Sequence, residues 1–269
     1  MLSGLAPARR RVVLALLTTV LVLALAGVGI LIAGRPSADE VEPVRQDALG
    51  PVLLVPGYGG GQGALRSLAD ILTAQGRDAT IVSAPGDGTG DLSSTADALD
   101  DAVGSALDRT GAASVDIVGY SAGGVVARLW VDADDNAGRV RRVVTLGSPH
   151  HGTTLADLAG DVAPGQCPIG CTQLGTGSDL LARLNAGDET PVGPTWVSVW
   201  TETDQTVTPP DSARLEGALN IPVQSVCPGV EVAHGELPRN PIVAAIVLAE
   251  LKAGEPARLT PADCPRAAG

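Results

Sequence analysis

The segment from Val115 to Val131 constrains the fold of this chain more than any other. A short apolar run, Val115–Val118, leads into Gly119-Tyr-Ser121-Ala-Gly123, and an apolar stretch with helical spacing follows. A G-x-S-x-G sequence between a buried strand and a helix places its serine on a tight, exposed turn. The glycines let the strand and the helix approach closely. We predict that Ser121 is a nucleophile; the alternative is a glycine-rich turn with an incidental serine.

Short β-branched runs alternate with amphipathic stretches on both sides of this motif. We predict further strands at 51–55, 79–83, 140–146, 196–200 and 223–226, and helices at 62–75, 94–109 and 240–252. The helix at 94–109 would begin at a capping box, Ser94-x-x-Asp97. Strands that alternate with helices predict a mostly parallel sheet of about six strands with helices on both faces.

The stretch 150–195 is long, rich in glycine and without clear periodicity. Long irregular segments inside a compact domain often cover or line a binding site. We therefore expect a lid or cap segment here.

A serine hydroxyl needs a general base, and the chain has three histidines, His150, His151 and His234. When a serine nucleophile lies on such a strand-to-helix turn, the base comes last in the sequence, after the acid. His234 fits this order because it lies between the predicted sixth strand and the last helix. His150 and His151 precede any suitable acid, so we expect them to be structural.

The acid of such a triad should lie between Ser121 and His234, just after a strand. The run 196–200 is followed by Thr-Glu202-Thr-Asp204, and Asp204 opens a turn that leaves the sheet. We predict that Asp204 orients the imidazole, with Glu202 as the second candidate. The alternative for Asp204 is a turn residue that bonds only to the backbone.

A developing oxyanion requires two backbone N–H donors. The residue after the nucleophile, Ala122, supplies one of them. The glycine-rich loop 56–61 after the first strand can supply the other, and Tyr58 is our candidate. A simple turn is the alternative interpretation of this loop.

The N-terminal region differs from the rest of the chain. Arg9, Arg10 and Arg11 precede a charge-free apolar run over 12–34, which is long enough to span a bilayer. Arginines before such a run keep that end in the cytoplasm. We expect 1–34 to be a signal anchor or a cleaved signal peptide, 35–50 a linker, and 51–269 a catalytic domain outside the cytoplasm, membrane-bound or secreted.

The four cysteines form an even set without a zinc-like C-x-x-C pair. An exported protein would oxidise them, and four cysteines allow three pairings. We predict Cys167–Cys171, a local closure over a turn, and Cys227–Cys264, which ties the C-terminal tail beside the sixth strand. Free thiols in a cytosolic enzyme are the alternative.

Composition excludes some classes of partner. The formal net charge is −12 and the body of the chain has no basic run, which disfavours nucleic-acid binding. We expect a monomer with an ester or lipid substrate, no cofactor and no metal. The chain has no Phe and 1 Met, so aliphatic side chains must fill its core.

These motifs together resemble secreted bacterial lipases and esterases of the compact α/β-hydrolase type, similar to triacylglycerol lipases of the class 2 kind. The resemblance rests on five segments, which are Val55–Gly60, Gly119–Gly124, Thr145–Thr153, Thr203–Val207 and Val232–His234. It implies the α/β-hydrolase fold, the triad Ser121, Asp204 and His234, and Tyr58 and Ala122 as oxyanion donors. Many such lipases have a histidine before the serine, where this chain has Tyr120.

Three functions agree with this pattern. We favour hydrolysis of carboxylic esters, such as acylglycerols, through an acyl-enzyme. An acyltransferase or a thioesterase would use the same triad with another acceptor or leaving group. A catalytically silent binding module on a hydrolase scaffold is the third, because a fold does not by itself imply activity.

Overall fold

A computed structural model describes residues 43–133 and 136–265. In these residues six parallel strands form one sheet, in the order β2-β1-β3-β4-β5-β6. The strands are β1 (Val52–Val55), β2 (Ala79–Ile81), β3 (Val115–Tyr120), β4 (Val140–Leu146), β5 (Thr195–Trp200) and β6 (Leu219–Pro222). The predicted parallel sheet of about six strands is confirmed.

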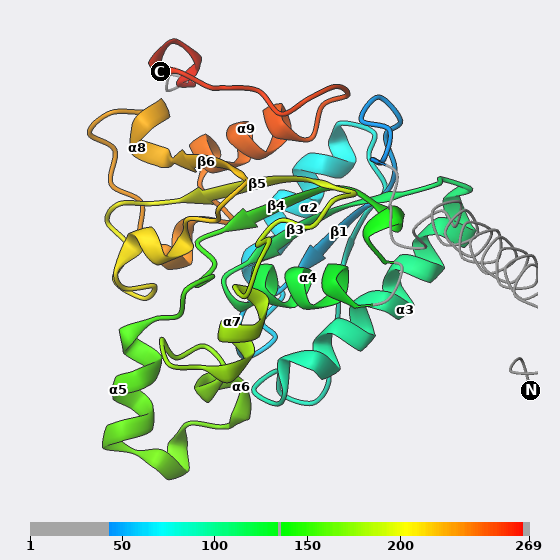
Figure 1. The fold of residues 1–269 in the computed structure, drawn as a ribbon. Helices are drawn as coiled ribbons and strands as arrows, with labels where there is room; N and C mark the ends of the chain where they lie inside the picture. Colours follow the sequence, from blue (N-terminus) through cyan, green and yellow to red (C-terminus); the bar gives the residue numbers. More distant parts are fainter. Residues whose placement is uncertain (1–42, 134–135, 266–269) are drawn as a thin grey trace, which may run out of the picture. The chain divides into compact units, whose positions relative to one another are not determined.

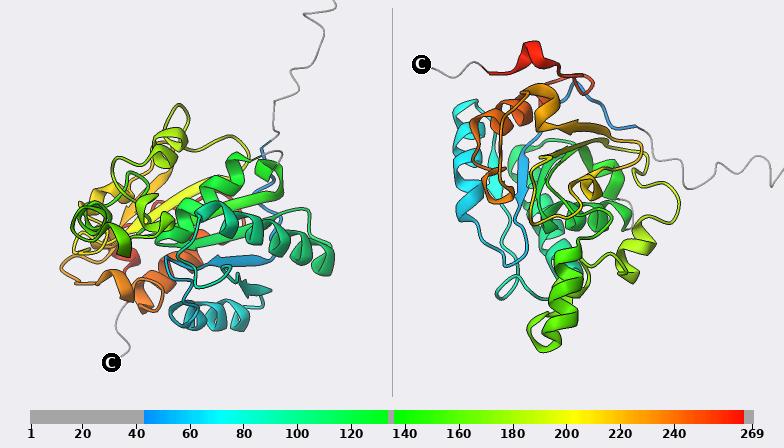
Figure 2. Two further views of the ribbon diagram at one scale, coloured as in Figure 1. Left: turned by 90° about the horizontal axis from the view of Figure 1, so that it is seen from below. Right: turned by 90° about the vertical axis from the view of Figure 1, so that its left-hand side faces the viewer.

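Helices cover both faces of the sheet (Figures 1 and 2). The helices are α2 (Gly63–Ala74), α3 (Leu92–Thr110), α4 (Ala122–Asp132), α5 (Thr154–Val162), α6 (Ile169–Thr172), α7 (Asp179–Leu184), α8 (Val223–Val226) and α9 (Pro241–Glu250). Short 3-10 turns occur at Asn136–Arg139, Pro164–Gln166, Pro210–Ala213, His234–Glu236 and Pro261–Asp263. The architecture is therefore three-layered, with the sheet in the middle.

Two aliphatic cores hold the layers together. One core joins α3 and α4 to the sheet through side chains such as Leu99 and Val125. The other joins α2 and α9 to the opposite face through side chains such as Leu68 and Ile246. Burial of the apolar stripe of each helix is the main driving force for this packing.

Two predicted elements were wrong. The apolar run 223–226 is the helix α8, and the sixth strand is the preceding segment, Leu219–Pro222, which pairs with β5. The helix α3 begins before the predicted capping box, because the side chain of Asp91 accepts a hydrogen bond from the Ser93 N–H and caps the helix there.

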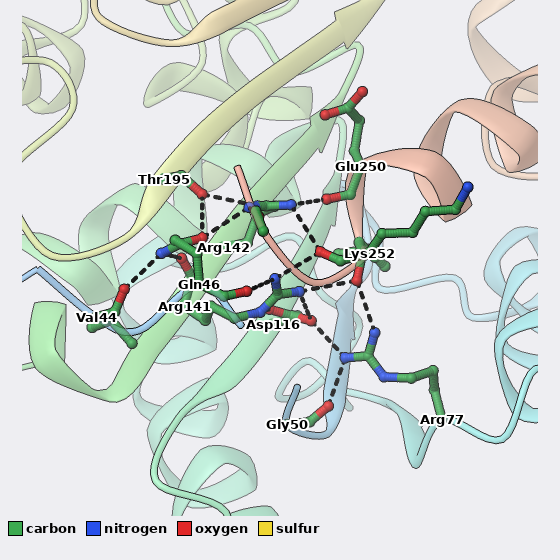
Figure 3. Close-up of polar contacts among 12 residues, drawn as sticks. Val44, Gln46, Gly50, Arg77, Asp116, Arg141, Arg142, Thr195, Glu250 and Lys252 are labelled. Carbon is green, nitrogen blue, oxygen red and sulfur yellow. Dashed lines mark hydrogen bonds and ion pairs between the residues drawn. The ribbon is translucent and has the colours of Figure 1, made fainter. Parts of the chain in front are cut away.

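Charged side chains are buried at the amino ends of β3 and β4 (Figure 3). Ser121 follows the opposite end of β3. Arg141 donates to both carboxylate oxygens of Asp116, at 2.8 and 2.6 Å, and all of these atoms are buried. Arg77 donates to the same carboxylate at 2.5 Å. Arg141 and Arg77 also donate to the carbonyl of Leu251, at the C-terminal end of α9, where a helix has unpaired carbonyls.

The chain before the sheet joins this network. The amide oxygen of Gln46 accepts hydrogen bonds from Arg142 at 2.8 Å and from Thr195 at 3.0 Å. Its backbone carbonyl accepts from the N–H of Gly254 and from Arg141. Gln46 of the predicted linker is thus hydrogen-bonded to the sheet and to the segment after α9.

The predicted membrane segment at 12–34 lies outside the described residues. Among the helices that the structure describes, none has the length and hydrophobicity needed to cross a bilayer.

Candidate active site

Ser121 lies at the junction of β3 and α4 with φ 52° and ψ −124°. It is the only non-glycine residue with positive φ in the described part of the chain, and such a conformation costs on the order of 1–3 kcal/mol. A Cβ added to Gly119 would lie 2.6 Å from the Gly123 carbonyl oxygen. The glycines of the motif therefore permit the close approach of strand and helix that holds Ser121 in this strained turn.

The structure brings His234 to Ser121 although 113 positions separate them. The distance from His234 Nε2 to Ser121 Oγ is 3.0 Å. His234 begins a short 3-10 turn, where the Glu236 carboxylate accepts a hydrogen bond from the Ala233 N–H. His234 is buried, with 8% of its surface exposed.

Asp204 follows β5 and is bonded to the other nitrogen of the same imidazole. Its Oδ2 lies 2.7 Å from His234 Nδ1. Its Oδ1 accepts the backbone N–H groups of Thr206 at 2.8 Å and Val207 at 2.9 Å. Both oxygens of the buried carboxylate are therefore occupied, and its orientation is fixed. The second candidate, Glu202, is exposed at the surface.

The other two histidines lie apart from this chain of hydrogen bonds. His150 is fully buried, with Nε2 3.1 Å from the Thr145 hydroxyl, and burial lowers its pKa well below the usual value for histidine. His151 is bonded to the carboxylate of Glu189 at 2.9 Å. Both contacts are those of structural residues in the loop after β4.

The loop after β1 packs directly against Ser121. A Cβ on Gly57 would lie 3.0 Å from the Ser121 Cβ, and the N–H of Gly59 donates to the Gly88 carbonyl at 2.9 Å. Tyr58 lines the cavity that contains Ser121. In the described residues neither the N–H of Tyr58 nor that of Ala122 has a protein acceptor, as an oxyanion hole requires.

A cavity of about 230 Å³ opens beside Ser121. Its walls are mostly apolar and include Pro149, Leu155, Ala156, Ala159, Leu174 and Val207. A larger hollow of about 370 Å³ lies between α2 and α9, but it contains none of the candidate site residues. Size alone therefore does not identify the site, whereas contact with Ser121 does.

The predicted cap segment, 150–195, is more regular than we expected, because it forms α5, α6 and α7. A disulfide joins Cys167 to Cys171 in α6. The N–H of Gly170 donates to the Thr89 carbonyl at 3.2 Å. A second disulfide joins Cys227 to Cys264, so both predicted pairings are present.

The chemistry available at this site is acid–base and nucleophilic. In residues 43–133 and 136–265, no group of three or more His, Cys, Asp or Glu side chains is arranged to hold a metal ion. The hydrogen-bonded order of carboxylate, imidazole and hydroxyl is the arrangement that turns a serine into a nucleophile.

Comparison with solved structures identifies the class of fold. The chain is similar to lipase B of Aspergillus fumigatus, with 19% identity and a TM-score of 0.67 over 81% of this chain and 56% of that one. The mature lipase BlEst2 of Bacillus licheniformis has 20% identity and a TM-score of 0.60 over 79% of this chain and 96% of its own. This chain has the α/β-hydrolase fold, as the resemblance predicted.

The chain spans only 56% of the length of the Aspergillus lipase that it matches. One family model matches residues 90–160 and is described as a domain of unknown function, DUF7379. These comparisons establish the fold, whereas the reaction has to be argued from the site.

Proposed function

We propose that this protein is a serine hydrolase that cleaves carboxylic acyl esters. The observation that carries the proposal is the continuous hydrogen-bonded chain from the Ser121 hydroxyl through His234 to the Asp204 carboxylate. Its position on a strained turn between β3 and α4 supports the same role, because this turn exposes the hydroxyl at the carboxyl edge of the sheet.

In the proposed reaction the Ser121 oxygen attacks the ester carbonyl, and His234 Nε2 takes the hydroxyl proton. Asp204 stabilises the imidazolium, and the N–H groups of Tyr58 and Ala122 stabilise the oxyanion. The bond between the carbonyl carbon and the alcohol oxygen breaks, and His234 returns the proton to the alcohol. Water then attacks the acyl-enzyme by the same route and releases the acid.

The walls of the cavity support an apolar acyl group as part of the substrate. Six of the lining residues have aliphatic or proline side chains, and burial of each methylene group contributes about 0.8 kcal/mol. We propose acylglycerols or other lipid-like acyl esters as the substrate class, with the protein acting as a monomer.

A fluorophosphonate probe and nitrophenyl esters test this proposal. We expect the full chain to be labelled and to hydrolyse the esters. Ser121→Ala and His234→Ala should lower kcat by about four to six powers of ten. Ser225→Ala is the matched control, because Ser225 is exposed and its hydroxyl donates to the Pro222 carbonyl. Equal labelling of Ser121→Ala and the native chain would refute the nucleophile assignment.

We also propose that the catalytic domain, 51–269, functions outside the cytoplasm, held by or released from an N-terminal membrane segment. The two disulfides support export, because a reducing cytosol keeps thiols free. Protease added to intact cells with a permeabilised wall should degrade the domain. Full protection would contradict export, and a mature N-terminus near residue 27 or 35 would identify a secreted enzyme.

A further inference from the structure

We propose that the cavity beside Ser121 binds the acyl chain and that Ala156 and Ala159 of α5 limit its useful length to about eight carbons. This inference rests on the proposed function.

The lining of the cavity indicates which part of the ester it receives. His234 returns the proton to the leaving alcohol, so the alcohol must lie on the histidine side of Ser121. The lining residues include Ser121 and Tyr58 but no residue from 208 to 265, so His234 is not among them. An ester bound with its carbonyl oxygen near the Tyr58 N–H therefore directs its acyl chain into the cavity.

The volume indicates how much of the chain is bound. The cavity has about 230 Å³, and a methylene group occupies about the volume of a water molecule, roughly 30 Å³. About seven or eight carbons fill this space. Because the cavity opens at the surface, a longer chain extends into solvent, where each additional methylene group gains no burial.

The wall formed by α5 is held in place at its first turn. The N–H of Thr154 donates to the Thr208 carbonyl at 2.9 Å. The Asp157 carboxylate accepts the N–H of Thr176 at 2.9 Å and its hydroxyl at 2.7 Å. Ala156 and Ala159 lie on the same face of this anchored helix, three positions apart, and both line the cavity. The first turn of α5 is thus tied to Thr208 and to Thr176.

The small size of these two residues leaves the space for the acyl chain. A leucine at 159 would add about three carbon atoms to the wall and remove the same amount of space from the ligand. Leu155 also lines the cavity, so its truncation to alanine would enlarge the space instead. The two changes are expected to move the length limit in opposite directions.

Two series of esters with the full chain test the inference, all below their aggregation concentrations. In nitrophenyl esters of increasing acyl length, kcat/KM should rise about twofold to fourfold for each methylene up to about eight carbons and then stay level. In butyrate esters of increasing alcohol length, kcat/KM should vary less than threefold in total. The inference would be overturned if kcat/KM levelled off with alcohol length instead of acyl length. It would also be overturned if kcat/KM rose with acyl length without levelling off.

Variants assign the limit to α5. Ala159→Leu should move the change of slope from about eight carbons to about five, and Leu155→Ala should move it to longer chains. Ala74→Leu, at the exposed end of α2, is the matched control and should leave it at eight. If the change of slope stays at about eight carbons in both variants, α5 does not set the limit. If Ala159→Leu does not fold, Leu155→Ala alone tests the role of α5. If no ester is cleaved and no probe binds, the proposed function itself is wrong.

Discussion

The hydroxyl of Tyr120 donates a hydrogen bond to the backbone carbonyl of His234 at 3.3 Å, and the two rings are packed with centroids 5.3 Å apart. Burial raises the pKa of Tyr120 to about 12, so the hydroxyl stays protonated and remains a donor. His234 is therefore held by Asp204 through its ring and by Tyr120 through its backbone. We infer that Tyr120 is a positioning residue.

Tyr120→Phe should lower kcat about threefold to tenfold with little change in KM. A hydrogen bond of this kind contributes about 0.5–1.5 kcal/mol, and its loss lets His234 move relative to Ser121. Steady-state kinetics with a nitrophenyl ester measure kcat and KM separately, and thermal unfolding is the control for a general loss of stability. A larger KM with unchanged kcat would indicate a role in substrate binding instead.

Asp204→Asn should lower kcat by about three to four powers of ten, because an amide favours the wrong imidazole tautomer. Glu202→Gln is the matched control on the same loop and should retain the native rate, since Glu202 is exposed. Hydrolysis of one ester by both variants measures the effect. Loss of activity in Glu202→Gln alone would reverse the assignment of the acid.

Glu250 is expected to make stability depend on pH. Its side chain is fully buried, and Oε1 has no hydrogen-bond partner among the residues that the structure describes. Burial raises its pKa from 4.5 to about 7. The folded state therefore favours the protonated acid. This contribution to the free energy of unfolding is fully present below pH 4.5 and is lost as the pH rises through 7. The total loss is about 3 kcal/mol.

Glu250→Gln should remove this dependence and be more stable than the native chain at pH 8. The glutamine oxygen can still accept the hydrogen bond that Glu250 receives from the Ala257 N–H. Denaturant unfolding at pH 5 and pH 8 measures the difference, with the exposed Glu216→Gln as control. Equal pH dependence in Glu250→Gln and the native chain would contradict this source of the effect.

The two disulfides should differ in their effect on stability. The bridge Cys227–Cys264 closes a loop of 37 residues, whereas Cys167–Cys171 closes one of 4. The loop-closure entropy of the unfolded chain predicts losses of about 4 and about 2 kcal/mol on removal. Paired Cys→Ser variants in denaturant titrations measure both. A larger loss for the short bridge would show that the folded-state contacts of α6 outweigh the entropy.

The sequence predicted the residues of the candidate site better than it predicted the secondary structure at the edge of the sheet. Ser121 could be placed because its motif requires both a preceding strand and a following helix, and both are evident in the sequence. Asp204 and His234 followed from chain order. Each constraint is local or sequential, so a single sequence was enough to name three residues that the structure joins in one hydrogen-bonded chain.

Other features depend on contacts that no local pattern reveals. The run 223–226 is apolar and β-branched like a strand, but Leu219–Pro222 occupies the edge of the sheet instead. The Gln224 side chain binds the Glu202 N–H and the Val230 carbonyl from the helix α8. The hydrogen bond between Tyr120 and His234 joins positions 114 apart, so no pattern of residue spacing in the sequence could have predicted it.

The network around Gln46 sets the smallest unit of this chain that should fold by itself. A chain that begins at Pro51 lacks the carbonyl that Arg141 and Gly254 bind and the amide that accepts from Arg142, so two buried guanidinium groups lose acceptors. A chain that begins at residue 43 keeps every one of these bonds. Anyone who separates the domain from its N-terminal segment should therefore cut before Val44, not at the start of the sheet.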